Sequence, residues 1–247
     1  MVSHPAQGTR LALDGREVGE GRMIDEVKVN IAGEVPLEGL LHLPGDRPPH
    51  GGVVVCHPHT AYGGTMHHAV VAAVARQAAR RGLAALRFNF RGAGNSGGHV
   101  GGGKAETADV AAALTFLAGQ IGPELPLALV GYSFGAVVAI AYLAEMIKRE
   151  SLPIQALALV GLPVAMEEFA WLDLSPLRES GLPVLVVAGA EDDLGGPADV
   201  QRALSPLGEN TVVKVVPGAE HMYVGHRGEV GRLVVDFLVA NLTTIPT

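Results

Sequence analysis

The sequence predicts an α/β fold in which a mostly parallel, twisted sheet is covered by helices on both faces. Short aliphatic runs alternate along the chain with segments of helical pattern, as they do where helices connect parallel strands. Apolar residues make up 48% of the 247 residues, enough to bury one large core. No repeat, low-complexity tract or linker divides the chain. We therefore expect one domain over residues 23–247, after a polar, glycine-bearing arm or tail at 1–22.

Eight segments have the composition of strands. Ile24–Ile31 partly alternates between apolar and polar residues, as a half-exposed strand does, and Leu37–Leu43 is its expected hairpin partner. We expect this N-terminal hairpin to form an antiparallel edge of the sheet. The other six segments are mostly aliphatic and are expected to be parallel. In order they are Gly52–Cys56, Leu83–Phe90, Leu127–Val130, Ile154–Val160, Pro183–Ala188 and Thr211–Val216.

Helical pattern fills most of the connections. The predicted helices are Thr65–Arg81, Ala105–Ala118, the segment after Ser133 to about Arg149, Pro197–Ala203 and His226–Leu242. Gly82 ends the first of them. Glu106 and Asp109 lie in the first turns of the second, where the helix dipole favours acids. The irregular link 161–181 is too short for a large cap domain, so we expect at most a small lid there.

The strongest functional signal is the sequence Gly-Tyr-Ser-Phe-Gly at 131–135, which joins an aliphatic strand directly to an apolar helix pattern. In this context G-x-S-x-G forms a sharp corner whose strained central residue projects its side chain from the sheet edge. The two glycines allow the strand and the helix to approach closely. The motif is short enough to occur by chance around a surface serine, but its context favours Ser133 as a nucleophile.

A serine hydroxyl is a weak nucleophile and needs a base within hydrogen-bond reach. The loops at the carboxyl ends of parallel strands share one edge of the sheet, so the base should follow a strand. His221 lies in the loop after the strand Thr211–Val216. His226 is the alternative, but it lies at the start of the next helix. We therefore favour His221 as the base.

The base in turn needs an acid that fixes its tautomer and stabilises its charged form. Three acids follow the strand Pro183–Ala188 at the same edge: Glu191, Asp192 and Asp193. We select Asp192 and keep Asp193 and Glu191 as alternatives, although an acidic surface turn is the better interpretation of those two. The resulting chain order of Ser, Asp and His is that of the α/β-hydrolases.

An oxyanion formed at this site needs two fixed hydrogen-bond donors. One is expected to be the backbone N–H of Phe134, at the start of the helix after Ser133. The second should come from the loop after Gly52–Cys56. Because Pro58 has no N–H, His59 is the nearest residue beyond it that can donate. We therefore predict an oxyanion hole made by the backbone N–H groups of His59 and Phe134.

Longer motifs add a family resemblance from about residue 24 to the end. They are Cys-His-Pro-His at 56–59, Tyr-Gly-Gly-Thr-Met at 62–66, Leu-Arg-Phe-Asn-Phe-Arg-Gly-Ala-Gly-Asn-Ser at 86–96 and Gly-Tyr-Ser-Phe-Gly at 131–135. On these the chain resembles the α/β-hydrolase superfamily, and within it the small, capless, dienelactone-hydrolase-like group. The resemblance implies an esterase-like triad of Ser133, Asp192 and His221. Two residues depart from it: Thr60 replaces a common proline, and Ser133 replaces the cysteine nucleophile of true dienelactone hydrolases, so their substrate is not carried over.

These observations predict a serine hydrolase that cleaves small carboxylic esters of short acyl chain through an acyl-enzyme. The same triad could serve a thioesterase, a peptidase or an acyltransferase. A hydrolase fold used only as a binding module is the alternative outside the enzymes, although all three triad positions hold competent side chains. Pocket residues are expected among the aromatic and sulfur-containing side chains near these loops: Tyr62, Tyr132, Trp171 and Met222.

Two further motifs suggest cofactors but lack the context that they need. Gly92–Gly97 matches G-x-G-x-x-G, yet more glycine follows where a helix should open, and no acid follows the next strand. Gly98–Lys104 nearly matches a P-loop, but Ala105 replaces the hydroxyl residue that binds Mg²⁺. We therefore predict no cofactor.

The histidines near the first loop could suggest zinc, but His57 and His59 have no third ligand at a recognised spacing. We interpret His57 as an inner loop residue bonded to backbone, and His67 and His68 as the opening of a helix at the pocket rim. We therefore predict no metal site.

Arg91 is expected to pair with a carboxylate under its loop.

Composition limits the partners and the compartment. The net charge of −7 and the lack of a basic stripe disfavour nucleic acid. No apolar run approaches the 18 residues of a membrane span, and the N-terminus has no signal-peptide core. One cysteine, Cys56, rules out an intrachain disulfide and fits a reducing compartment, so we expect a cytoplasmic protein. A homodimer through the edge hairpin or the last helix is compatible with the sequence.

Overall fold

A computed structural model describes residues 24–45 and 47–242. Its strands are β1 Ile24–Ile31, β2 Leu37–Pro44, β3 Gly52–Cys56, β4 Ala84–Phe88, β5 Leu127–Tyr132, β6 Ala156–Val160, β7 Val184–Gly189 and β8 Thr211–Val216. Its helices are α1 Ala69–Arg80, α2 Glu106–Ile121, α3 Phe134–Lys148, α4 Glu167–Ala170, α5 Ser175–Ser180, α6 Pro197–Leu204 and α7 Arg227–Asn241, with 3₁₀ helices η1 Thr60–Tyr62 and η2 Ser205–Asn210. The predicted arm at 1–22 lies outside the described residues.

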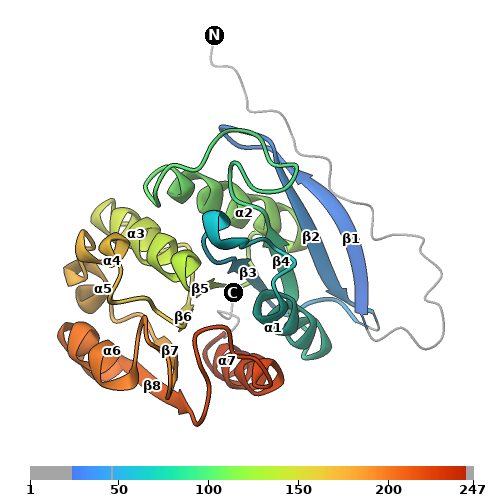
Figure 1. The fold of residues 1–247 in the computed structure, drawn as a ribbon. Coiled ribbons are helices and arrows are strands. Elements are labelled where there is room, and N and C mark those ends of the chain that lie inside the picture. The colour runs from blue at the N-terminus through green and yellow to red at the C-terminus, as the bar shows by residue number, and fades with distance from the viewer. Residues whose placement is uncertain (1–23, 46, 243–247) are drawn as a thin grey trace.

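The strands form one eight-stranded sheet in the order β1-β2-β4-β3-β5-β6-β7-β8 (Figure 1). Strand β2 pairs antiparallel with both β1 and β4, and each of the other neighbouring pairs is parallel. This confirms the predicted mostly parallel sheet with an antiparallel N-terminal edge. The carboxyl ends of β3, β5, β6, β7 and β8 consequently lie along one edge, where their loops can build a common site.

Alternation along the central strands divides the core into two layers. On one face of the sheet, β-strand residues such as Val54 and Leu129 pack with α2, α3, α5 and α6. On the other face, Val55 and Val130 pack with α1 and α7. Burial on both faces explains why these strands are aliphatic at successive positions.

In the part of the chain that the structure describes, no helix combines the length and apolar character that a membrane crossing requires.

Helix α1 begins four residues later than the predicted start at Thr65. The backbone of Met66 is held by β4 and the loop after it: its N–H donates to Asn89 Oδ1 at 2.7 Å, and its carbonyl accepts from Arg87 Nη1 at 2.8 Å. His68 then forms the N-cap, with its Nδ1 accepting from Val70 N–H. These contacts come from residues distant in sequence, so local pattern could not reveal them.

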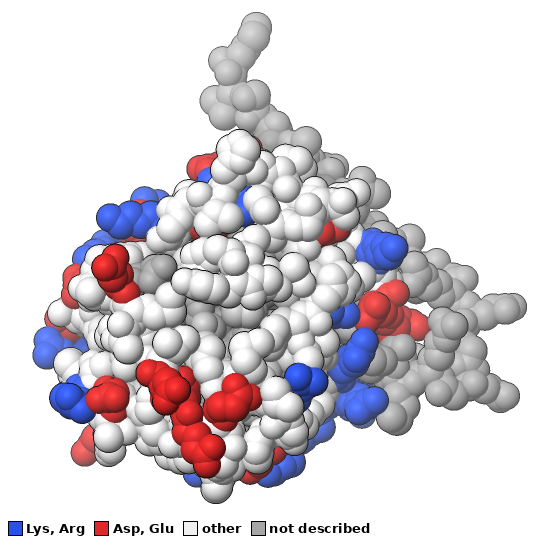
Figure 2. All heavy atoms as spheres, in the orientation of Figure 1, with Lys and Arg blue, Asp and Glu red and all other residues white. Residues whose placement is uncertain are grey.

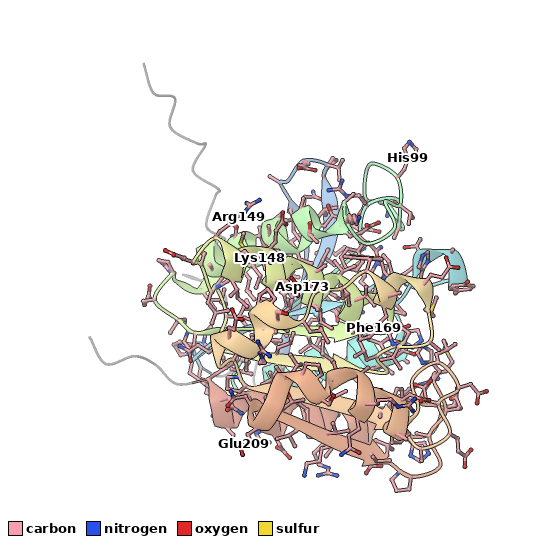
Figure 3. The ribbon with its side chains drawn as sticks, turned by 90° about the vertical axis from the view of Figure 1, so that its left-hand side faces the viewer. His99, Lys148, Arg149, Phe169, Asp173 and Glu209 are labelled. Carbon is pink, nitrogen blue, oxygen red and sulfur yellow. The ribbon has the colours of Figure 1, made fainter. Side chains whose placement is uncertain are left out.

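The link 161–181 contains two short helices, α4 and α5, rather than being wholly irregular. It is tied to α3 by a salt bridge between Lys148 Nζ and Asp173 Oδ2 at 2.8 Å; Figure 3 shows the two residues side by side. Both side chains are substantially exposed, so this bridge orients the link more than it stabilises the fold. Helix η2, between α6 and β8, was not predicted.

Candidate active site

Ser133 occupies the corner between β5 and α3, with φ 54° and ψ −121°. A positive φ is unusual and strained for a residue with a side chain. The flanking glycines are required by close packing. A Cβ at Gly135 would lie 2.7 Å from the carbonyl oxygens of Cys56 and His57, and one at Gly131 would collide with the backbone of Gly135 and Ala136. The predicted strand-to-helix corner is therefore present, with Ser133 at its turn.

The side chains of Ser133, His221 and Asp192 form one continuous chain of hydrogen bonds. Ser133 Oγ lies 2.9 Å from His221 Nε2, and His221 Nδ1 lies 2.9 and 3.0 Å from the two carboxylate oxygens of Asp192. Asp192 is buried and also accepts from the N–H groups of Leu194 at 2.9 Å and Gly195 at 3.1 Å. These two bonds fix the direction of the carboxylate independently of His221.

The alternatives named from the sequence lie elsewhere. His226 approaches Glu229, with its Nδ1 3.7 Å from the carboxylate, and Glu191 and Asp193 are exposed. An ionised carboxylate can only accept hydrogen bonds, so beside it His221 Nδ1 carries the proton and the Nε2 lone pair faces the Ser133 hydroxyl. The arrangement can therefore take a proton from Ser133 Oγ.

Several contacts hold the loop that carries His221. Tyr132 donates its hydroxyl to the His221 carbonyl at 2.9 Å, and burial raises the pKa of this tyrosine, which keeps it a donor. Tyr223, with φ 52°, donates to the Val187 carbonyl at 2.9 Å. The Glu220 carboxylate accepts from two backbone N–H groups, of Val224 and Met222, and the first of these does most to hold its pKa below the ordinary value.

Sequence reasoning missed Glu220 and Tyr223 as positioning residues. No motif marks either of them. The only available hint was general: a buried tyrosine usually needs a hydrogen-bond partner for its hydroxyl. That rule does not tell which tyrosines are buried, so the assignment needed the structure.

His57 anchors the opposite side of the site. Its Nε2 accepts from Phe90 N–H at 3.0 Å, so its Nδ1 carries the proton and donates to the Pro58 carbonyl at 2.6 Å. Burial lowers the pKa of His57 to about 4, so the ring stays neutral. The prediction that His57 is an inner loop residue bonded to backbone is confirmed.

That bond also bears on the predicted oxyanion donor. The Pro58 carbonyl and the His59 N–H belong to one planar trans peptide, in which the two point in opposite directions. Holding the carbonyl toward His57 therefore directs the His59 N–H away from it. Phe134 contributes the first N–H of α3, where the helix leaves N–H groups without intrahelical partners. The oxyanion role of these two groups stays a prediction.

Arg91 and Asp109 hold the start of the glycine-rich loop 91–104 against α2. The guanidinium donates from Nε and Nη2 to both carboxylate oxygens at 2.8 to 3.1 Å, and the Arg91 N–H adds a bond of 2.9 Å. Both residues are buried. The predicted pairing of Arg91 with a carboxylate is confirmed.

A cavity of about 500 Å³ opens above Ser133. Its lining is Pro58, His59, Tyr62, His68, Tyr132, Ser133, Met166, Leu194, His221 and Met222. The predicted pocket residues Tyr62, Tyr132 and Met222 are among them; Tyr62 is 80% exposed and Met222 45% exposed at the rim. Leu194 was missed, because only the bend after Asp192 brings it to the cavity.

Trp171 does not line this cavity, and its prediction as a pocket residue is wrong. It follows α4 and faces a separate cavity of about 330 Å³ between the link and α3. There Lys104 Nζ lies 5.4 Å from the centre of its ring, within the range of a cation–π contact. Met166 and Trp171 lie at opposite ends of the short helix α4 and line different cavities, which the irregular pattern of the link did not reveal.

The face shown in Figure 2 carries few charged side chains at its centre, while Asp and Glu gather in its lower part and Lys and Arg at its margins. The cavity lining likewise contains no Lys, Arg, Asp or Glu. Over the described ranges 24–45 and 47–242, no group of three or more His, Cys, Asp or Glu side chains is placed to hold a metal ion. The polar groups that line the cavity are therefore those of Ser, His and Tyr and the backbone.

Comparison with known proteins agrees with this architecture. RP471 of Rickettsia prowazekii, an uncharacterised protein, is 29% identical over 192 residues, which cover 75% of this chain and 77% of that protein. The structure of XC6422 from Xanthomonas campestris, an α/β serine hydrolase without a lid, has a TM-score of 0.76 at 27% identity and covers 90% of this chain and 97% of its own. An α/β serine hydrolase homologue from Coxiella burnetii has a TM-score of 0.74 at 29% identity, and the match covers 86% of this chain and 97% of that chain.

A family model for the alpha/beta hydrolase domain matches residues 52–232. This range begins at β3 and ends within α7, so it covers most of the sheet and its helices. It also contains Ser133, Asp192 and His221. The chain belongs to the α/β-hydrolase family.

Proposed function

We propose that this protein is a serine hydrolase that cleaves small carboxylic esters, with Ser133 as nucleophile, His221 as base and Asp192 as the acid that orients it. The observation that carries the proposal is the unbroken chain of hydrogen bonds from Ser133 Oγ through His221 to Asp192, with distances of 2.9 Å at both steps. A surface serine would not require a strained backbone, a buried acid and a bonded imidazole in one place.

The proposed reaction has two halves. Ser133 Oγ attacks the ester carbonyl while His221 Nε2 takes the hydroxyl proton, and the charged imidazole is stabilised by Asp192. His221 returns the proton to the leaving alkoxide as the carbon–oxygen bond breaks, which frees the alcohol and leaves an acyl-enzyme. Water then gives a proton to His221 and attacks the acyl group. His221 returns this proton to Ser133 Oγ as the carboxylic acid departs.

The negative charge that develops on the carbonyl oxygen needs fixed donors. The N–H groups of His59 and Phe134 are proposed for this role. Support comes from the His57 hydrogen bond to the Pro58 carbonyl, which presets the peptide carrying the His59 N–H. One preset donor of this kind typically contributes about 2.7–4 kcal/mol to transition-state stabilisation.

The cavity favours an uncharged substrate. It lacks charged side chains, and aromatic rings and two methionines form much of its wall. A carboxylate or an ammonium group placed here would lose hydration without gaining a counter-ion. Thioesters, peptides and other acyl acceptors could use the same three residues, but no contact in the cavity selects for them. The complete hydrogen-bond relay also argues against a purely binding role.

Labelling with a fluorophosphonate tests whether Ser133 is activated. These probes react with a serine whose hydroxyl is deprotonated by an adjacent base, so the folded protein is expected to be labelled once per chain, at Ser133. Intact-mass measurement and peptide mapping identify the site. Folded protein that resists the probe would count against an activated nucleophile and would favour the binding-module alternative.

The size of the cavity predicts a preference for short acyl chains. We expect p-nitrophenyl butanoate to be hydrolysed at least several-fold faster, by kcat/KM, than the dodecanoate, because about 500 Å³ must hold both halves of the ester and the link 161–181 adds only two short helices as cover. The measurement is a chain-length series below the micellar concentration of each ester. A faster rate on the C12 ester would show that the site extends beyond this cavity.

A further inference from the structure

His68 lines the same cavity as Ser133, although it belongs to neither the proposed triad nor the proposed oxyanion hole. It is half-buried and forms the N-cap of α1. Its Nδ1 accepts a hydrogen bond from Val70 N–H at 3.3 Å. Because an accepting nitrogen carries no proton, the neutral ring must hold its hydrogen on Nε2.

The cap also fixes how this ring is turned. With Nδ1 directed to the backbone of α1, Nε2 at the far end of the ring is the nitrogen left to face the cavity. No hydrogen bond of this Nε2 to the protein is present among the described residues. Two other polar atoms of the lining are already occupied: the Tyr132 hydroxyl donates to the His221 carbonyl, and His59 Nδ1 accepts from Ala61 N–H. His68 therefore presents an N–H donor to whatever fills the cavity.

Ring contacts connect His68 to His221 through the Tyr132 ring, which lies next to the nucleophile in the chain. The His68 ring lies 4.9 Å from the Tyr132 ring, which in turn stacks 5.9 Å from the His221 ring. Burial lowers the pKa of His68, and the charges of Arg227 and His221 lower it further, so the ring is neutral near pH 7. The electrostatic interaction between the two imidazoles is consistent with this proximity.

Reaction chemistry then assigns a part of the substrate to this position. In the proposed mechanism His221 must hand its proton to the leaving oxygen, so the alcohol portion of the ester lies beside His221. We propose that His68 is a specificity-determining residue whose Nε2–H binds a hydrogen-bond acceptor on the alcohol portion of the ester, so that alcohols with an ether, hydroxyl or carbonyl oxygen near the scissile bond are preferred over plain alkyl alcohols. This inference rests on the proposed ester hydrolysis.

The test compares two esters of the same size, 2-methoxyethyl butanoate and butyl butanoate, which differ by one oxygen in place of a methylene group. The wild-type protein is compared with His68→Asn, since asparagine retains a good N-cap but removes the imidazole. We expect the ratio of kcat/KM for the methoxyethyl ester to that for the butyl ester to fall about fivefold in the variant, as for the loss of one neutral hydrogen bond. Intrinsic differences in leaving-group reactivity cancel in this comparison.

Three controls make the outcome specific. His68→Ser, which also caps α1, should give the same fall, and the exposed neighbour variant His67→Asn should leave the ratio at its wild-type value. A pair that differs on the acyl side, butyl methoxyacetate and butyl butanoate, should show no change in its ratio. An unchanged alcohol-side ratio in both His68 variants, or an equal change on the acyl side, overturns the assignment. A wild-type protein that hydrolyses none of these esters and resists fluorophosphonate removes the proposed function as well.

Discussion

Replacement of Ser133 by alanine is expected to lower kcat for ester hydrolysis by about 10⁶-fold, the loss seen when the nucleophile of a serine hydrolase is removed. The reason lies in the geometry of the site. Without Oγ, His221 has no hydroxyl at 2.9 Å to deprotonate, and no acyl-enzyme can form. A water molecule activated by His221 is the remaining nucleophile, and it is not held by the corner between β5 and α3. Steady-state hydrolysis of p-nitrophenyl butanoate and loss of fluorophosphonate labelling measure the effect.

The variant should fold normally, which keeps the result interpretable. Alanine at φ 54° carries much the same backbone strain as serine, and the hydroxyl contributes only its bond to His221. Ser151→Ala removes a hydroxyl from an exposed serine and is the matched control, with activity and labelling expected at wild-type levels. Wild-type-like turnover by folded Ser133→Ala protein would refute the assignment of the nucleophile.

Much of the fold could be predicted because the relevant information is local. The bounds of β1 and β8 agree with the structure, since alternation and β-branched runs report directly on burial along a strand. The start of α1 could not be placed, because the groups that hold the Met66 backbone come from Arg87 and Asn89. Such competition between side chains and the helix ladder leaves no periodic signal.

The same distinction applies to the site. Ser133 was selected from the local sequence Gly-Tyr-Ser-Phe-Gly, and Asp192 and His221 because the carboxyl ends of parallel strands share an edge of the sheet. The structure joins these three side chains in one chain of hydrogen bonds. Trp171 was misassigned because the direction of its side chain, at the C-terminal end of the short helix α4, depends on how the link packs against α3, which sequence pattern does not encode. Leu194 was missed for a similar reason: the turn that brings it to the cavity is closed by hydrogen bonds to Asp192.

Replacement of Asp192 by asparagine is expected to lower kcat about 10⁴-fold while leaving the fold intact, as in other triads of this kind. The asparagine Oδ1 can still accept from the N–H groups of Leu194 and Gly195, which hold the present carboxylate. Its amide NH₂ then faces His221 Nδ1 and makes this nitrogen an acceptor. The imidazole proton moves to Nε2, so the lone pair that should take the Ser133 proton is lost. The variant thus changes the tautomer of the base without removing any residue from the relay.

Asp193→Asn separates this effect from the loss of negative charge near the site. It makes the same chemical change at the next residue, which is exposed, so kcat is expected to stay within about twofold of wild type if the tautomer is what matters. Fluorophosphonate labelling should slow strongly in Asp192→Asn and remain rapid in Asp193→Asn, with thermal unfolding confirming that both variants are folded. If the two variants lost activity equally, the role of Asp192 would be a general electrostatic one. If only Asp193→Asn lost activity, Asp192 would not be the catalytic acid. Its hydrogen bond to His221 would then have no part in catalysis.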